Sequence, residues 1–293
     1  MGTRFVQKAS SLIRRVNTSS VADHYGKGGS LLNTIIKELR KVNSLDNITI
    51  DDLAPMDEFH IGGREATQEF LKQLNICETH HVLDVGCGLG GTARFVASHF
   101  GCKVTGVDIT PEFISCGKEL TRMVGLTNNV ELLVGSALDL KTILGGTNHS
   151  FDKAFMLHVG MNIEDKSLLV SEIAATLRPG GLLGIYDVMK TGGNATQDLD
   201  FPVPWTNDAS TNFVAPPDEY RTAIKSAGLK IISERNRLDF AVKFFSIMKE
   251  KKNISPIGLH LLMDDFPQKM GNMLGNLNMG RIAPIEMIAE KVY

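Results

Sequence analysis

A short apolar run leads directly into a glycine-rich turn at residues 82–91, and this segment constrains the fold more than any other. It reads Val-Leu-Asp-Val-Gly-Cys-Gly-Leu-Gly-Gly. Such a run predicts a buried strand, a tight turn and then a helix, because glycine permits a tight turn and close approach of a ligand to the backbone. Units of this kind belong to α/β domains, which bind ligands at the carboxyl ends of their parallel strands.

From residue 82 onward, strand patterns alternate with helix patterns, as stacked βαβ units do. We expect strands at 82–85, 103–107, 130–134, 153–157 and 182–188, and helices at 90–100, 111–124 and 165–177. The last third predicts a helix at 217–227, a strand at 230–235, helical segments at 240–251 and 259–277, and a final strand at 283–292. The predicted fold class is therefore α/β, with a doubly wound, mostly parallel, seven-stranded Rossmann-like sheet and helical lid elements.

A chain of 293 residues is at the upper limit of one hydrophobic core, which favours one large domain with a lid. We expect residues 1–75 to form an N-terminal helical lid segment and residues 76–293 to form the ligand-binding domain. Lid insertions are expected near 189–217 and 240–280, because these segments interrupt the strand and helix pattern.

The composition is that of an ordinary globular enzyme, with 43% apolar residues, 22% charged residues and a formal charge of −2. We therefore expect no nucleic-acid partner and, without an apolar run of roughly 18 residues, no membrane partner. The four scattered cysteines indicate reduced thiols and a cytoplasmic protein. A basic, amphipathic segment at 1–22 leaves a mitochondrial or other organellar location open. A homodimer is also left open.

Two cofactor classes fit the glycine turn. Gly86, Gly88 and Gly91 also satisfy the dinucleotide pattern G-x-G-x-x-G, and Asp108 follows at the spacing of its ribose-binding acid. Asp84 favours the other class, because a carboxylate beside the turn would repel a pyrophosphate and attract the sulfonium or ammonium of S-adenosylmethionine. The alternative is that Asp84 only stabilises the turn.

The run V-L-D-V-G-C-G-L-G-G, followed by V-T-G-V-D, resembles the first two motifs of the class I S-adenosylmethionine-dependent methyltransferases. The resemblance implies S-adenosyl-L-methionine as cofactor and S-adenosyl-L-homocysteine as product. It implies that Asp108 holds the ribose hydroxyls and that Ile109 flanks the adenine. We expect the remaining contacts of this loop to come from Asp84, Gly86, Gly88 and Gly90.

A third segment, residues 135–139, is similar to the family's motif that meets the adenine amino group. It reads Gly-Ser-Ala-Leu-Asp, with Ser136 where an acid is usual. Contact with adenine there falls to Ser136, to the backbone of Ala137 or to Asp139. The run 177–181 resembles the family's turn before the fifth strand, since proline and glycine favour a tight reversal.

Candidate catalytic residues are His158, Tyr186 and Trp205. His158 closes the fourth predicted strand, where a side chain faces the crevice beside the cofactor; the alternative is a buried structural histidine. Tyr186 and Asp187 end the fifth, and their alternative is a buried hydrogen-bonded pair. Methyl transfer is an in-line displacement that needs positioning and, for a protonated nucleophile, a base. It requires no metal, and no histidine spacing indicates one.

The segment 56–63 precedes a predicted helix, whose N-terminal amides suit a carboxylate such as that of the methionine moiety. His60 and Gly62 are therefore cofactor candidates. Tyr25 and His158 are further cofactor candidates. With Tyr25 and the Phe-Pro-Val-Pro-Trp run at 201–205, this segment resembles small-molecule methyltransferases that include sarcosine/dimethylglycine N-methyltransferases. Aromatic side chains could surround a cationic amine, or simply pack in the lid: Phe59, Phe201, Trp205 and Phe213.

The resemblance predicts a methyltransferase with a small-molecule methyl acceptor, first of all an amine such as sarcosine or dimethylglycine. The alternatives are O- or C-methylation of a metabolite, methylation of phosphoethanolamine, and a cofactor-binding protein without turnover.

Overall fold

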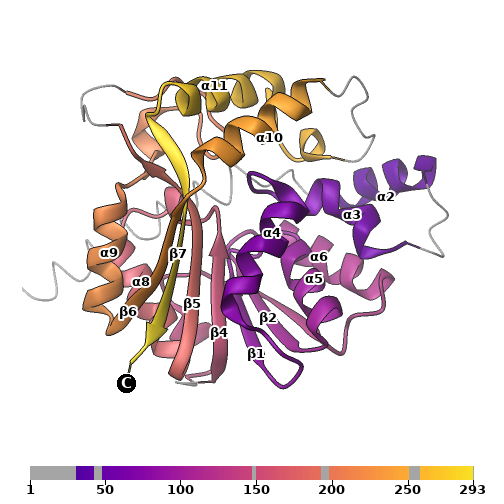
Figure 1. Cartoon of the computed structure of the whole chain (residues 1–293). Coiled ribbons are helices and arrows are strands. Elements are labelled where there is room, and N and C mark those ends of the chain that lie inside the picture. Colours follow the sequence, from indigo (N-terminus) through magenta and orange to yellow (C-terminus); the bar gives the residue numbers. More distant parts are fainter. Residues whose placement is uncertain (1–30, 43–47, 147–149, 193–197, 251–257, 293) are drawn as a thin grey trace, which may run out of the picture.

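The computed structural model describes residues 31–42, 48–146, 150–192, 198–250 and 258–292. Its centre is a seven-stranded sheet in the order β3-β2-β1-β4-β5-β7-β6 (Figure 1). The strands β1 to β5 are parallel, and β7 runs antiparallel to both β5 and β6. The strands are β1 His81–Val85, β2 Lys103–Asp108, β3 Val130–Val134, β4 Phe151–Leu157, β5 Leu177–Lys190, β6 Leu229–Asn236 and β7 Ile282–Lys291.

Helices cover both faces of the sheet, as the predicted doubly wound fold requires. One face packs against α8 Lys166–Thr176 and α9 Pro217–Ser226, with Leu83 and Val85 of β1 in the shared core. The other face, which carries Val82, packs against α4 Gly63–Leu71, α5 Gly91–Phe100 and α6 Pro111–Met123. This division follows from the alternation of side chains along a strand. The predicted fold class is confirmed.

Two boundaries differ from the prediction at the fifth strand. β5 begins at Leu177, because the predicted turn at 177–181 is a bulge inside the strand, where the pairing shifts from Phe151↔Leu177 to Lys153↔Leu182. β5 also continues to Lys190, because β7 pairs with it as far as Ile282. Tyr186 and Asp187 therefore lie inside β5, and the prediction that they end it was wrong.

The predicted helical segment at 259–277 is also shorter than expected. Its regular helix is α11 Phe266–Asn278, preceded by the 3₁₀ turn η5 Leu259–Leu261. Asp265 adopts a left-handed conformation with φ of 53°, and Pro267 occupies the first turn of α11. Both features start a helix and prevent it from continuing upstream.

Helices α10 Leu238–Glu250 and α11 lie beyond the carboxyl ends of the parallel strands (Figure 1). They enclose an apolar group, which we call the Trp205 cluster, consisting of Ile61, Met161, Val188, Val203, Trp205, Ala241, Phe245, Met273, Leu277 and Ile282. Helices α2 Leu31–Val42 and α3 Ile50–Asp57 pack on α6 through a separate core. The proposed lid role of α2, α3, α10 and α11 stays a prediction, and so does the domain division at residue 75.

No helix within the described residues is both long and apolar enough to span a bilayer. All four cysteines are free, and only Cys77 is exposed. The basic segment at 1–22 and Tyr25 lie outside the described residues.

Candidate functional site

The glycine loop between β1 and α5 has the backbone conformation that its sequence predicts. Gly86, Gly88 and Gly90 have φ angles of 73°, 54° and 78°, which L-residues with side chains rarely adopt. Gly86 also approaches the segment after β4, because a Cβ atom there would lie 2.4 Å from Cγ2 of Val159. The loop and the segment carrying His158 are therefore in direct contact.

Asp108, at the end of β2, holds the loop in place. One carboxylate oxygen, Oδ2, accepts a hydrogen bond from the amide of Gly88, and Oδ1 accepts one from the amide of Thr110, both at 2.8 Å. Burial nevertheless raises the pKa of Asp108. Each oxygen keeps a lone pair, so the carboxylate can still accept bonds from two hydroxyls. The ribose role of Asp108 stays a prediction, and so does the adenine contact of the half-buried Ile109.

Asp84 lies in β1, opposite Gly106 of β2 and Phe155 of β4, and is 3% exposed. Its Oδ2 atom is buried and has no hydrogen-bond partner among the described residues. Burial, with the nearby Asp108 charge, raises the pKa of Asp84 to about 8. A buried carboxylate oxygen without a partner is costly, and a cationic group beside it would remove that cost. The carboxylate of Asp84 therefore fits a sulfonium or ammonium ligand.

His158 follows β4 in a left-handed conformation with φ of 54°, which is uncommon for a residue with a side chain. Its amide donates to the carbonyl of Tyr186 at 2.7 Å, which fixes the turn. Its Nε2 atom is buried without a partner in the described chain. Burial, together with the neighbouring His60, lowers the pKa of His158, so the ring is neutral. Backbone strain of this kind clusters at functional sites.

Three aromatic rings meet beside the glycine loop. The centroid of the His158 ring lies 5.0 Å from that of Tyr186 and 6.1 Å from that of His60. The hydroxyl of Tyr186 donates to the carbonyl of Ile61 at 3.0 Å, and burial raises the pKa of Tyr186. The hydroxyl is therefore neutral and already paired. The catalytic role of Tyr186 stays a prediction. Because the hydroxyl is paired with Ile61, such a role would fall to the aromatic ring and not to the hydroxyl oxygen.

Asp187 belongs to a different environment from Tyr186, because successive residues of a strand face opposite sides of the sheet. Its Oδ2 accepts a hydrogen bond from the Tyr220 hydroxyl of α9 at 2.7 Å, and Oδ1 accepts from the amide of Val188. Burial raises the pKa of Asp187 to about 6. Sequence reasoning treated Tyr186 and Asp187 as one pair and missed Tyr220.

Trp205 is buried in the cluster named after it. Its indole N–H donates to Oδ1 of Asn212 at 2.9 Å, and Phe201 packs against the same cluster. Phe59 and Phe213 are half-buried. The catalytic role of Trp205 and the aromatic enclosure of an amine stay predictions, and the lid-packing alternative describes the observed position of Trp205.

The segment after β3 adjoins the loop through Asp108, whose carbonyl accepts a hydrogen bond from the amide of Gly135 at 2.8 Å. The hydroxyl oxygen of Ser136 accepts a hydrogen bond from the amide of Leu138, and Ser136 and Ala137 are half-buried. The structure thus brings the three cofactor motifs to one edge of the sheet. Their individual contacts stay predictions.

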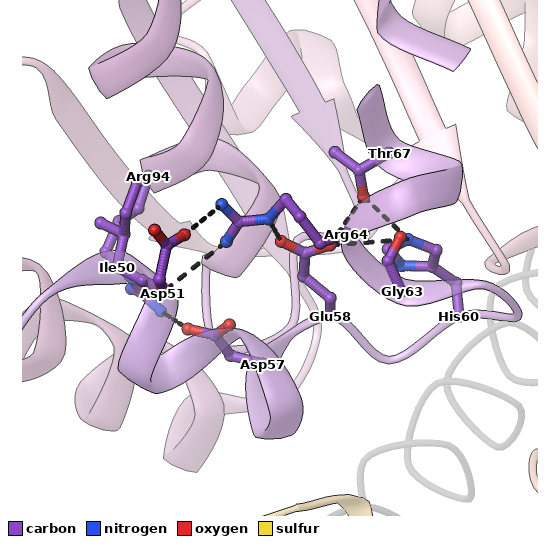
Figure 2. A network of polar contacts seen from close by, with 9 residues as sticks. All are labelled: Ile50, Asp51, Asp57, Glu58, His60, Gly63, Arg64, Thr67 and Arg94. Atoms are coloured by element: carbon purple, nitrogen blue, oxygen red, sulfur yellow. Dashed lines mark hydrogen bonds and ion pairs between the residues drawn. The ribbon is translucent and has the colours of Figure 1, made fainter. Parts of the chain in front are cut away.

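A polar network that sequence reasoning missed links α3 to α4 (Figure 2). The carboxylate of Glu58 accepts hydrogen bonds from Nε of Arg64 and from the Thr67 hydroxyl, the latter at 2.8 Å. Thr67 Oγ1 also lies 2.9 Å from Nε2 of His60. Arg64 continues to Asp51 at 3.0 Å and stacks over Phe95. Arg64 and Thr67 lie three residues apart in α4, and this helical spacing is the sequence signal that could have placed them on one side of the helix.

The glycines of the 56–63 segment are only partly available to a ligand. Gly62 is the N-cap of α4 with φ of 91°, while the amide of Gly63 donates to the carbonyl of His60 at 3.2 Å. The expectation that the N-terminal amides of this helix are available to a carboxylate was therefore wrong for Gly63. The cofactor role of Gly62 stays a prediction.

No group of three metal-ligating side chains is arranged around a common point within the described ranges.

Comparison with known proteins gives one domain match, to a methyltransferase domain, over residues 82–181. The methyltransferase GfsG of Streptomyces halstedii is 27% identical over 72% of this chain and 73% of its own length. Phosphoethanolamine N-methyltransferase 1 of Zea mays is 28% identical over 65% of this chain, which spans only 35% of that relative.

Solved structures share the fold. Geranyl diphosphate C-methyltransferase from Streptomyces coelicolor, in complex with S-adenosyl-L-homocysteine, has a TM-score of 0.66 at 16% identity, covering 94% of this chain and 98% of that one. A protein from Galdieria sulphuraria, provisionally assigned as a sarcosine dimethylglycine methyltransferase, has a TM-score of 0.60 at 19% identity, covering 88% and 98%. The matched domain spans the glycine loop and the strand ends that carry Asp84, Asp108 and His158. The chain therefore contains a methyltransferase domain and is an S-adenosylmethionine-dependent methyltransferase, similar to enzymes that act on small molecules.

Proposed function

We propose that this methyltransferase acts on the nitrogen of a small amine, with glycine derivatives such as sarcosine and dimethylglycine as the first candidates. The observation that carries the proposal is His158, a neutral histidine with a buried, unpartnered Nε2 beside the glycine loop. An amine in water is largely protonated and must lose its proton before it can act as a nucleophile. A neutral imidazole can accept a hydrogen bond from the N–H of the amine and so orient the nitrogen lone pair toward the methyl group.

We propose that the cofactor lies along the carboxyl ends of β1, β2 and β3. Asp84 would face its cationic end, Asp108 its ribose hydroxyls, and Ile109, Ser136 and Ala137 its adenine. When bound, S-adenosylmethionine supplies an electrophilic methyl group. The backbone of Gly86, Gly88 and Gly90 would allow close approach, because no side chain stands between the loop and the ligand.

In this proposal His158 orients the acceptor amine, whose N–H donates a hydrogen bond to Nε2. The backbone bond to Tyr186 fixes the turn that carries the ring. Preorganisation of this kind contributes to the rate, because the reacting groups need no further ordering. Tyr186, whose hydroxyl is bonded to Ile61, would contribute an aromatic face toward a cationic amine.

The relatives support an acceptor of low molecular mass without fixing its identity. The maize protein is a phosphoethanolamine N-methyltransferase, and the S. coelicolor protein is a geranyl diphosphate C-methyltransferase. O- or C-methylation is the second candidate function. The apolar Trp205 cluster favours this second candidate. Ile61 belongs to the cluster, and its carbonyl accepts the hydrogen bond from Tyr186, so an apolar surface that suits an apolar substrate adjoins Tyr186.

A labelled-methyl transfer screen tests the proposal. Purified protein and methyl-labelled cofactor are combined with sarcosine, dimethylglycine, phosphoethanolamine and a set of phenols and prenyl diphosphates. Transfer to an amine, lost in His158→Ala with cofactor affinity preserved by calorimetry, supports the proposal. Transfer confined to phenols or prenyl diphosphates would replace N-methylation by the second candidate. Cofactor binding without any transfer would favour a cofactor-binding protein without turnover.

A further inference from the structure

Thr67 contacts both His60 and Glu58, and Arg64 pairs with Glu58 on its other side (Figure 2). The Glu58 side chain is 0% exposed and that of His60 is 3% exposed. Burial of so many polar groups in one place is costly unless every donor meets an acceptor. The arrangement of protons in this network can therefore be worked out from the distances.

The carbonyl of Gly63 decides the protonation of His60. Its oxygen lies 3.1 Å from Nε2 of His60, and a carbonyl can only accept a hydrogen bond. Nε2 must therefore carry a proton. Burial lowers the pKa of His60 to about 4, so near neutral pH the ring carries one proton only. Nδ1 is then left with a free lone pair.

The contacts of Thr67 also require a proton on Nε2 of His60. Its single hydroxyl proton serves the Glu58 carboxylate at 2.8 Å, so its oxygen acts as an acceptor toward Nε2 of His60 at 2.9 Å. Arg64 supports donation from the Thr67 hydroxyl to Glu58. Its guanidinium pairs with Glu58 and favours the charged carboxylate, although burial raises the pKa of Glu58. With the opposite tautomer, Gly63 and Nε2 would face each other with two lone pairs.

We propose that Glu58 and Thr67 are positioning residues that hold His60 as the Nε2–H tautomer, so that Nδ1 accepts a hydrogen bond from an N–H or O–H of the methyl acceptor. This inference rests on the proposed function for the identity of that acceptor. Within the described residues Nδ1 makes no hydrogen bond, and the His60 ring stands edge-on to those of His158 and Tyr186. A lone pair cannot bind a carboxylate. His60 would therefore accept a hydrogen bond from the methyl acceptor and would not contact the carboxylate of the cofactor.

Nitrogen-15 NMR of histidine-labelled protein tests the tautomer without any acceptor. The His60 signals are assigned by their loss in His60→Gln. At pH 7.5 we expect the pattern of a neutral ring protonated at Nε2. A ring protonated at Nδ1, or at both nitrogens, would overturn the inference. Failure of the proposed function would leave this spectrum unchanged, so the two failures are distinguishable.

A second measurement tests the positioning role. Thr67→Val removes one of the two acceptors that face Nε2 and leaves only the Gly63 carbonyl, so the fraction of the Nδ1–H tautomer should rise. It should also lower kcat/KM for the acceptor found in the screen roughly tenfold, since about one hydrogen bond is lost. Thr67→Ser should restore both readouts, because it keeps the hydroxyl. Thr222→Val, at a helical threonine bonded only to the carbonyl of Asp218, controls for the substitution itself. The Nδ1 signal should move when the acceptor is added with S-adenosylhomocysteine. A tautomer ratio unchanged in Thr67→Val, or an Nδ1 signal unmoved at saturation, contradicts the proposal.

Discussion

Asp57 and Arg94 form a buried ion pair that joins the end of α3 to the first turns of α5, directly after the glycine loop (Figure 2). The guanidinium also donates to the carbonyls of Leu89 and Gly117 at 2.7 and 3.2 Å. A single fully buried side chain thus holds the loop, α6 and the N-terminal helices together. The conformation of the glycine loop therefore depends on residues outside the matched methyltransferase domain.

Asp57→Ala should destabilise the protein by about 3–5 kcal/mol, because it leaves the Arg94 charge buried and uncompensated. Denaturant unfolding followed by fluorescence measures the change. Glu119→Ala removes the exposed partner of Arg122 and should leave the unfolding midpoint nearly unchanged. Equal shifts for the two variants would mean that the Asp57 pair contributes no more than a surface pair.

Gly86→Ala should lose more stability and more cofactor affinity than Gly125→Ala. Both glycines have φ of 73°, so both variants carry the same left-handed strain of about 1–2 kcal/mol. Only at Gly86 would the new Cβ atom also collide with Val159, whereas nothing lies within 4 Å at Gly125. Calorimetric titration with S-adenosylmethionine and denaturant unfolding measure both effects. If the two variants behave alike, the contact between Gly86 and Val159 is unimportant.

Cofactor affinity should rise with pH through the titration of Asp84. Its pKa of about 8 means that the free protein holds Asp84 largely neutral at pH 7, while a cationic ligand favours the ionised form. Binding should therefore release a proton below pH 8, and affinity should gain up to about tenfold per pH unit there. Calorimetry in buffers of different ionisation enthalpy measures the release.

Asp84→Asn is the control for this titration, because it removes the carboxyl group and leaves only the ionisation of the cofactor's own amine. The variant should bind more weakly, with a shallower pH dependence. An identical pH dependence in both proteins would assign the titration to the cofactor and refute the role of Asp84.

The strands and the order of the motifs could be predicted from the sequence because they depend on local patterns. The glycine turn after Val85 and the helix start at Pro111 are set by neighbouring residues. The bulge at the start of β5 could not be predicted, since it depends on how Leu182 registers against β4. For the same reason Tyr186 was wrongly placed at the end of the strand. β5 continues beyond Tyr186 because it pairs with β7, about a hundred residues later in the chain.

The positions of single residues at the strand ends could be predicted, and the contacts between distant residues could not. Asp84 lies near the end of β1, Asp108 ends β2 and His158 follows β4, so the three lie at one edge of the sheet, as the fold rule requires. The partners of buried charges were missed, because nothing in the sequence tells that Arg94 reaches Asp57 or that Tyr220 reaches Asp187. Such contacts join elements far apart in the chain, and only the tertiary packing selects them.

Tyr220→Phe should destabilise the protein more at pH 8 than at pH 5. Burial raises the pKa of Asp187 to about 6, above its unfolded value near 3.8, so its ionisation costs stability progressively as the pH rises through that interval. The Tyr220 hydroxyl offsets this cost, because it donates to the carboxylate. Its loss should cost about 1 kcal/mol when Asp187 is neutral and about 1.5–3 kcal/mol when it is charged. Tyr186→Phe loses a bond to a carbonyl, which does not titrate, so its effect should be the same at both pH values. Urea unfolding of both variants at pH 5 and pH 8 separates the two cases, and a pH-independent effect of Tyr220→Phe would show that Asp187 stays neutral throughout.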